Sequence, residues 1–285
     1  MKEKPCLLGE CLAELIGTFI LVFFGTGSVA TAVLTGAQQG LWQVAVVWGF
    51  AISLAIYATS AVSGTHINPA VTVSMAVLRP RDFPARKIPA YLVSQMLGGV
   101  LASLVLLSLF SGICVHFEAV HNIVRGTPGS QLSAMWFGEY FPNPAILGTD
   151  APAFKAVSPA NAFAAEAVGT AFLLFFVFAL TDRRNPNAPS GSSNLYAYFI
   201  GFTVAIVISI VAPLTQAGLN PARDFAPRIV AYFAGWGPIA IPGPRGSEWW
   251  LYILAPIVGG LVGATLYDSL VRRFLPAPEA APRIA

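Results

Sequence analysis

Charged residues are scarce in this chain. Asp, Glu, Lys and Arg make up 10% of its 285 residues, whereas soluble globular domains carry about 25%. No charged side chain occurs within residues 15–78, 88–117 or 185–222, and uncharged apolar windows of about 18 residues or more predict transmembrane helices. With 56% hydrophobic residues and a mean hydropathy of +0.69, a soluble fold would expose large apolar patches and aggregate. The composition therefore excludes an ordinary soluble domain and predicts a polytopic helical membrane protein.

Cysteine and clustered reactive side chains are also scarce. The chain has three cysteines, Cys6, Cys11 and Cys114, with no C-x-x-C pair, so we expect no disulfide framework. The sequence offers no evident nucleophile–base pair and no group of metal-ligating residues, so we expect neither an enzyme nor a cofactor or metal site. A net charge of +3 is too small to suggest a nucleic-acid partner.

Apolar stretches of two lengths are present. Two short ones, about 68–78 and 220–231, would be roughly 16 Å long as helices, about half of a ~30 Å hydrocarbon core, and are too short to cross a membrane. Lys and Arg are more numerous in the loops that share a side with both termini, which favours cytoplasmic N- and C-termini. The long stretches predict spans at 9–35, 41–61, 86–110, 160–181, 195–214 and 249–271.

The two halves of the chain repeat each other. "AELIGTFILVFF" at 13–24 matches "AEAVGTAFLLFF" at 165–176 in seven of twelve positions, at an offset of 152. "NPA" at 68–70 and at 220–222 keeps the same offset, whereas "LGG" at 97–99 corresponds to "VGG" at 258–260 at an offset of 161. Three spans per repeat is an odd number, so the halves insert with opposite topology. In such inverted repeats a site forms near the midplane, where broken helices meet.

Each short stretch contains Asn-Pro-Ala, which predicts the start of a helix. Asn is a favoured N-cap, and Pro is favoured at the first helical position. Non-helical backbone at membrane depth is tolerated only where it is buried or lines water. We therefore predict two half-helices that enter from opposite faces, with the extended segments before them supplying carbonyl acceptors to a pore. Those carbonyls are the ones of Gly64, Thr65, His66, Ile67, Gln216, Gly218 and Leu219. The centre of the pore is formed by Asn68, Pro69, Ala70, Asn220, Pro221 and Ala222.

This arrangement predicts exclusion of ions and protons. Two positive helix ends face each other at the centre and disfavour cations. A water there accepts hydrogen bonds from the amides of Asn68 and Asn220, which interrupts an oriented proton wire.

Four further polar residues lie within the apolar segments. Arg223 follows the second Asn-Pro-Ala and is a functional candidate by default, at the extracellular side. Glu14 and Glu166 occupy matching positions and either form a proton relay or accept hydrogen bonds from the pore loop of their own half; their symmetry favours the second role. His66 either gates by protonation or contributes a carbonyl to the pore.

These residues resemble the aquaporin superfamily, over about residues 8 to 273. The segments "GTHINPAVT", "HNIVRG", "FPNP", "PLT", "NPARDFAPR" and "AGWG" are similar to the aquaglyceroporin branch of bacterial glycerol facilitators. Asp224, directly after Arg223, is typical of that branch. The resemblance implies an all-α membrane protein with six transmembrane helices, two re-entrant half-membrane helices and a right-handed bundle. It also implies that Glu14, Glu166 and Asp224 support the pore loops.

The resemblance places a selectivity filter near the outer mouth at Trp48, Ile208, Ala217 and Arg223. Water-selective members have His where this chain has Ile208, which argues against a water-only filter. Glycerol facilitators have Gly at Ile208 and an aromatic residue at Ala217, so this chain departs at both positions. Its combination is similar to the filter of nodulin-26-like channels, which pass glycerol and metalloid hydroxides. Tyr252 and Ile253 also stand where glycerol facilitators have Pro and Leu.

We therefore predict a passive channel for glycerol and other small neutral solutes, with some water, in the plasma (bacterial inner) membrane. The alternatives are a metalloid-hydroxide channel, a water-selective channel and, from a different class, an ion- or proton-coupled transporter. Family members are tetramers, so we expect a homotetramer in the lipid bilayer. We predict a single channel domain over 1–285, with repeats at 8–110 and 160–273, an extracellular linker at 111–159 and a disordered tail at 274–285.

Overall fold

The computed structural model describes residues 5–189 and 194–276, and within these ranges every regular element is helical. Six stretches of the described residues are long and apolar enough to cross a membrane: Leu7–Thr35, Leu41–Ser63, Ala85–Val120, Pro159–Thr181, Tyr196–Thr215 and Glu248–Phe274. They coincide with the six predicted spans. The third differs most, because its helix runs to Val120, so that residues 111–120 of the expected linker are helical.

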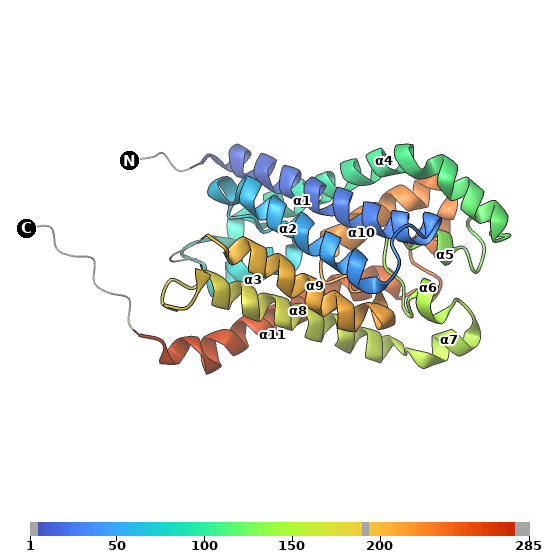
Figure 1. Cartoon of the computed structure of the whole chain (residues 1–285). Helices are drawn as coiled ribbons and strands as arrows, with labels where there is room; N and C mark the ends of the chain where they lie inside the picture. The colour runs from blue at the N-terminus through green and yellow to red at the C-terminus, as the bar shows by residue number, and fades with distance from the viewer. Residues whose placement is uncertain (1–4, 190–193, 277–285) are drawn as a thin grey trace, which may run out of the picture.

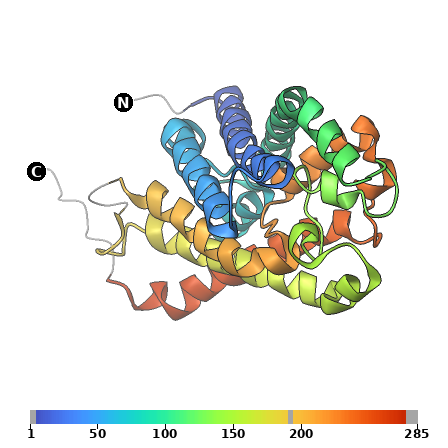
Figure 2. The ribbon, with the colours of Figure 1, turned by 45° about the vertical axis from the view of Figure 1, so that its right-hand side comes forward.

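The long helices form one bundle (Figure 1). Helix α1 begins and α11 ends at the same end of this bundle, whereas the short helices α5 to α7 lie at the opposite end (Figures 1 and 2). The predicted disordered tail lies, from residue 277 onward, outside the described residues. The long helices are α1 (Leu7–Ala30, continued by the π-helical turn Thr31–Thr35), α2 (Leu41–Ser63), α4 (Ile88–Val120), α8 (Pro159–Thr181), α9 (Tyr196–Thr215) and α11 (Glu248–Leu270).

Two half-length helices lie between the long ones, as the Asn-Pro-Ala pattern predicts. Helix α3 (Pro69–Leu78) and helix α10 (Pro221–Ala231) each begin at the proline and are capped by the asparagine before it. Helix α10 continues into a π-helical turn, Tyr232–Trp236, and a 3₁₀ turn, Gly237–Ile239. Short 3₁₀ turns also precede α4 (Ala85–Lys87) and follow α11 (Arg272–Phe274).

Close helix packing follows the internal repeat. Gly98 on α4 lies against the backbone of Leu15, and Gly259 on α11 lies in the same way against Ala167 on α8. A Cβ atom at either glycine would overlap that backbone, so neither position tolerates a larger residue without separating the helices. The offsets are 161 between the glycines and 152 between their partners. The two repeats therefore have the same packing as well as the same sequence pattern.

The linker between the repeats folds inward. It contains α5 (Gln131–Ala134), α6 (Pro144–Leu147) and α7 (Ala151–Ala156). Residues 130–144 are buried apart from Leu132, which is half-buried. Several of their aromatic side chains, Trp136 and Phe137 among them, pack with Trp236 beyond the end of α10. This part of the linker is therefore a covering layer over the second half-helix.

Candidate functional site

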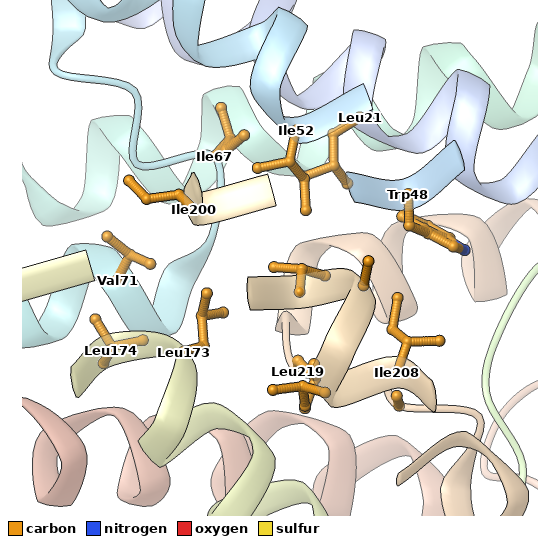
Figure 3. Close-up of a cluster of buried hydrophobic side chains, with 14 of the residues drawn as sticks. Leu21, Trp48, Ile52, Ile67, Val71, Leu173, Leu174, Ile200, Ile208 and Leu219 are labelled. Carbon is orange, nitrogen blue, oxygen red and sulfur yellow. The ribbon is translucent and has the colours of Figure 1, made fainter. Parts of the chain in front are cut away.

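A cavity of about 470 Å³ lies along the middle of the bundle. It extends from Arg183 and Asn194, near the end where α8 finishes, to Trp48 and Arg223 on the side of the linker. Figure 3 shows its apolar side, where Leu21, Ile52, Ile200 and Leu219 project from different elements around a common centre and Trp48 and Ile208 lie at one end. All of these residues line the cavity. The lining thus extends past the starts of both half-helices, at Asn68 and Asn220.

The two Asn-Pro-Ala asparagines meet in this cavity. The Oδ1 atom of Asn68 accepts from the N–H of Ala70 at 2.8 Å, and that of Asn220 accepts from the N–H of Ala222 at 3.0 Å. Capping uses the oxygen of each amide, so its NH₂ group faces the opposite repeat. Asn68 Nδ2 donates to the carbonyl of Leu219 at 3.0 Å, and Asn220 Nδ2 donates to that of Ile67 at 2.8 Å. One hydrogen of each amide remains for a molecule in the cavity.

The segments before the half-helices have an unusual backbone. Thr65 and Ile67 have positive φ angles of 52° and 44°, and the matching Ala217 and Leu219 have 60° and 55°. Residues other than glycine rarely adopt a left-handed backbone conformation, and they keep it only where the surrounding structure fixes them. Of the seven residues predicted to present carbonyls, six line the cavity and Gln216 does not.

The glutamates fix these segments. Glu14 accepts hydrogen bonds from the backbone N–H groups of His66 at 2.8 Å and Ile67 at 2.7 Å. Glu166 accepts from those of Gly218 at 2.9 Å and Leu219 at 2.7 Å. Both carboxyl groups are fully buried. The contacts of the two glutamates match at an offset of 152. They are the hydrogen bonds expected if each glutamate accepts from the pore loop of its own half.

The linker side of the cavity carries the four residues assigned to a filter. Trp48, Ile208, Ala217 and Arg223 are each less than 5% exposed and all line the cavity. The guanidinium carbon of Arg223 lies 4.1 Å from the centre of the Trp48 ring. One wall at this end therefore carries the donors of a guanidinium group, and the side chains of Trp48, Ile208 and Ala217 make the other walls apolar.

Glu139 is a residue of this end that the sequence analysis missed. It lies in the buried part of the linker, is 1% exposed, and forms an ion pair with Arg223. A lone acid inside the aromatic stretch "WFGEYF" was the available signal. A buried charge needs a partner, but nothing in the sequence spacing indicated that this partner is Arg223.

A second buried ion pair lies behind Arg223. Arg228, which is fully buried, donates through Nε to both carboxylate oxygens of Asp224, at 2.8 and 2.9 Å. Asp224 also accepts from the backbone N–H of Glu139 at 2.6 Å. Arg228 donates to the carbonyl of Ala240 at 2.9 Å and to that of Glu139. The pair therefore joins α10 to the linker segment that carries Glu139.

Gln216 joins the linker to the second pore loop. Its Oε1 atom accepts from the N–H of Tyr140 at 2.9 Å, and its Nε2 donates to the carbonyl of Met135 at 3.0 Å. Asn143 Nδ2 donates to the carbonyl of Ala212 at 3.0 Å, in the last turn of α9. The side chain of Gln216 thus binds the linker at two backbone groups.

His66 lines the cavity two residues before Asn68, in the segment that leads into α3. Its ring packs against Phe83, with centroids 4.5 Å apart, and against Tyr91 at 5.1 Å. Its Nδ1 atom is 3.3 Å from the hydroxyl of Thr72. The ring is therefore enclosed by two aromatic side chains.

Ion pairs join the helices at the end of the bundle that holds the termini. Arg79, after α3, pairs with Asp268 on α11 at 2.7 Å, and Arg272 pairs with Asp182, after α8, at 2.9 Å. Burial opposes ionisation of Asp182, but hydrogen bonds from the N–H of Arg184 and the hydroxyl of Tyr267, with the charge of Arg272, lower the pKa of its carboxyl overall. Within residues 5–189 and 194–276, no group of His, Cys, Asp and Glu could hold a metal ion.

Comparisons with known proteins agree with this architecture. The sequence profile of the family described as "Major intrinsic protein" matches residues 1–267. The chain is 41% identical to the glycerol uptake facilitator protein of Pseudomonas aeruginosa, over 97% of this chain and 93% of that one. It is 36% identical to the propanediol uptake facilitator of Citrobacter freundii, over 95% and 94%. Its fold is similar to the X-ray structure of the aquaglyceroporin from Plasmodium falciparum, with a TM-score of 0.77, 24% identity, and coverage of 93% and 97%.

Proposed function

Because the chain belongs to the major intrinsic protein family, we propose that it is a passive channel for glycerol and similar small neutral solutes, driven only by their concentration gradients. The relatives named for glycerol and propanediol uptake support this substrate class. The observation that carries the proposal is the composition of the cavity at Trp48 and Arg223. A polyol has hydroxyls along one edge and CH groups along the other, and this cavity offers donors on one wall and apolar side chains on the others.

Ile208 and Ala217 decide the breadth of the solute range. Ile208 supplies no hydrogen-bonding side chain at a position that a water-selective filter fills with His, so we propose that water is not the sole permeant. Ala217 places a single methyl group where a second aromatic ring would narrow the slot. That small side chain favours a second set of permeants, namely small neutral hydroxides such as arsenous and boric acid.

The glutamates argue against coupled transport. A proton-coupled carrier needs a titratable group that is free to change partners during transport. Glu14 and Glu166 each accept two backbone N–H groups and a hydroxyl, from Ser63 and Thr215 respectively. We therefore assign both carboxylates to support of the pore loops.

Stopped-flow light scattering on proteoliposomes tests the proposal. We expect glycerol flux well above that of empty vesicles, without any proton or sodium gradient and unaffected by an uncoupler. Arsenous acid, urea and water measured on the same vesicles give the order of permeability. Fast water flux with glycerol at the level of empty vesicles would overturn the polyol assignment, and sensitivity to the uncoupler would overturn the passive mechanism.

Orientation and assembly complete the proposal. We infer cytoplasmic N- and C-termini in the bacterial inner membrane, from the excess of Lys and Arg in the loops on their side. We infer a homotetramer, with subunit contacts on the outer face of α2 and α9, where Phe50, Tyr198 and Phe202 border a shallow groove. Native mass spectrometry of the detergent-solubilised protein tests the tetramer. Labelling in intact and opened cells tests the orientation, with a single cysteine placed near either terminus of a variant whose own cysteines are replaced by Ser.

A further inference from the structure

Two tyrosines stand in equivalent positions of the repeats. Tyr91 on α4 and Tyr252 on α11 are separated by 161 residues, which is the offset that relates Gly98 to Gly259 on the same helices. Both side chains are almost completely buried. The repeat therefore places one tyrosine beside each pore loop, although the sequences around the two tyrosines differ.

Each tyrosine hydroxyl donates to the last residue of the helix that leads into a pore loop. Tyr252 Oη donates to the carbonyl of Thr215 at 2.9 Å, and Tyr91 Oη donates to that of Ser63 at 3.0 Å. Ser63 ends α2 and Thr215 ends α9. The last carbonyls of a helix have no intrahelical partner, and a buried carbonyl left without one costs free energy. The tyrosines thus satisfy the same orphan acceptor in both repeats.

The residues held by the tyrosines are also held by the glutamates. The side-chain hydroxyl of Thr215 donates to Glu166 at 2.5 Å, and that of Ser63 donates to Glu14 at 2.8 Å. Each pore loop therefore starts at a residue whose carbonyl and hydroxyl are both fixed. Left-handed residues follow directly, at Gln216 and Ala217 in the second repeat and at Gly64 and Thr65 in the first.

The two tyrosines differ in what else they contact. The ring of Tyr252 lies against Gly218, because a Cβ atom added at Gly218 would be 2.7 Å from Tyr252 Cδ1. The centre of the Tyr252 ring is also 6.3 Å from that of Phe141 in the linker. The hydroxyl of Tyr91 also lies 3.1 Å from Glu10 Oε2, so its single proton is shared. The hydroxyl of Tyr252 therefore donates to the loop that carries Ala217. The hydroxyl of Tyr91 can donate either to the carbonyl of Ser63 or to the carboxylate of Glu10.

We propose that Tyr252 is a positioning residue for solute selection, which acts by fixing the Thr215 carbonyl and hence the backbone of Ala217 and Gly218 at the filter. Tyr91 is its counterpart at the inner loop and affects the overall flux without changing the order of permeability. The inference rests on the proposed function in one respect, namely that the filter is the end of the cavity that contains Ala217 and Arg223.

The test compares three Tyr→Phe variants in proteoliposomes, each measured for glycerol and water on the same vesicles. Tyr252→Phe keeps the ring and removes the donor. Glycerol needs an apolar wall and several polar groups placed together, whereas water needs fewer, so we expect the glycerol-to-water ratio to fall about fivefold. Tyr91→Phe should lower both fluxes and keep the ratio within about twofold of wild type. Tyr57→Phe, on an exposed face of α2, is the matched control and should match wild type.

After the fluxes of empty vesicles are subtracted, the ratio of the two channel fluxes is independent of the number of folded channels, so partial loss of folded protein does not mimic the expected result. An unchanged ratio in Tyr252→Phe, or an equal change in Tyr91→Phe, would overturn the inference. If Tyr252→Phe does not fold, p-aminophenylalanine at this position keeps an N–H donor and should retain the wild-type ratio, and a changed ratio there would count against the donor role. If wild type passes no glycerol, the proposed function fails on its own, and the water-to-urea ratio still tests Tyr252.

Discussion

Replacement of Glu166 by Gln tests the support of the second pore loop. The carboxylate accepts from three donors: Oε1 from the Gly218 N–H and the Thr215 hydroxyl, and Oε2 from the Leu219 N–H at 2.7 Å. In Glu166→Gln one oxygen remains, and it can keep the first two donors. The new NH₂ group then faces the N–H of Leu219, so two donors oppose each other and one buried donor loses its acceptor.

The expected cost follows from that count. A buried donor left without an acceptor costs about 1–3 kcal/mol, and the opposed donors add to it, so we expect a loss of about 2–3 kcal/mol in stability of the folded channel. The first repeat supplies the comparison, because Gln95 Nε2 donates to Glu14 Oε2 at 2.8 Å. In Glu14→Gln a flipped Gln95 amide can accept from the new NH₂ group, so we expect the smaller loss there.

The assay is thermal unfolding of both variants in one detergent, followed by glycerol flux per folded channel. We expect the order wild type, Glu14→Gln, Glu166→Gln in unfolding temperature, and fluxes that respond to neither a proton gradient nor an uncoupler. Wild-type stability in Glu166→Gln together with loss of a proton-dependent flux would refute this reasoning, because the carboxylate would then be a proton carrier and not a structural acceptor.

Three further predictions follow from other contacts. Ala217→Phe should retain glycerol and lower the flux of a four-carbon polyol at least about tenfold, since the added ring narrows the slot; equal loss of both solutes in the stopped-flow assay would show that this side chain does not border the constriction. Arg228→Met should destabilise the protein by about 3–5 kcal/mol because Asp224 stays buried and charged, and Arg228→Met combined with Asp224→Leu should recover part of the loss in thermal unfolding. The pKa of Asp182 is lowered in the folded state, so the stability that this carboxylate contributes is complete above its unfolded pKa of about 3.9 and is lost as the pH falls through its lower folded value. The unfolding temperatures of wild type and Asp182→Asn should therefore converge on acidification. A constant difference between them down to pH 2 would contradict this.

The described structure agrees with the predictions that depend only on residues close together in the sequence. Apolar length predicts the long helices, and the Asn-Pro pairs at Asn68 and Asn220 predict both half-helix starts, because a cap needs only the adjacent N–H groups. The repeat predicts that equivalent residues have equivalent contacts, which holds for Glu14 and Glu166. The end of α4 was placed ten residues early, because residues 111–120 continue the helix beyond the apolar stretch that was used to define the span.

The contacts at the end of the cavity next to the linker depend on the tertiary fold. Glu139 meets Arg223 across 84 residues, and Gln216 turns its side chain to the linker, because residues 130–144 fold down onto the second pore loop. No local propensity encodes this meeting, since the partners are 84 residues apart in the sequence.

The sequence by itself determined the membrane class, the spans, the inverted repeat and the capped half-helices. Each of these depends on length, composition or the nearest few residues. Only the tertiary structure decided that Glu139 pairs with Arg223, that Arg228 is buried on Asp224, and that Tyr91 and Tyr252 donate to the ends of α2 and α9. These contacts join distant segments, and they form because polar groups enclosed by packing must find partners wherever the fold places them.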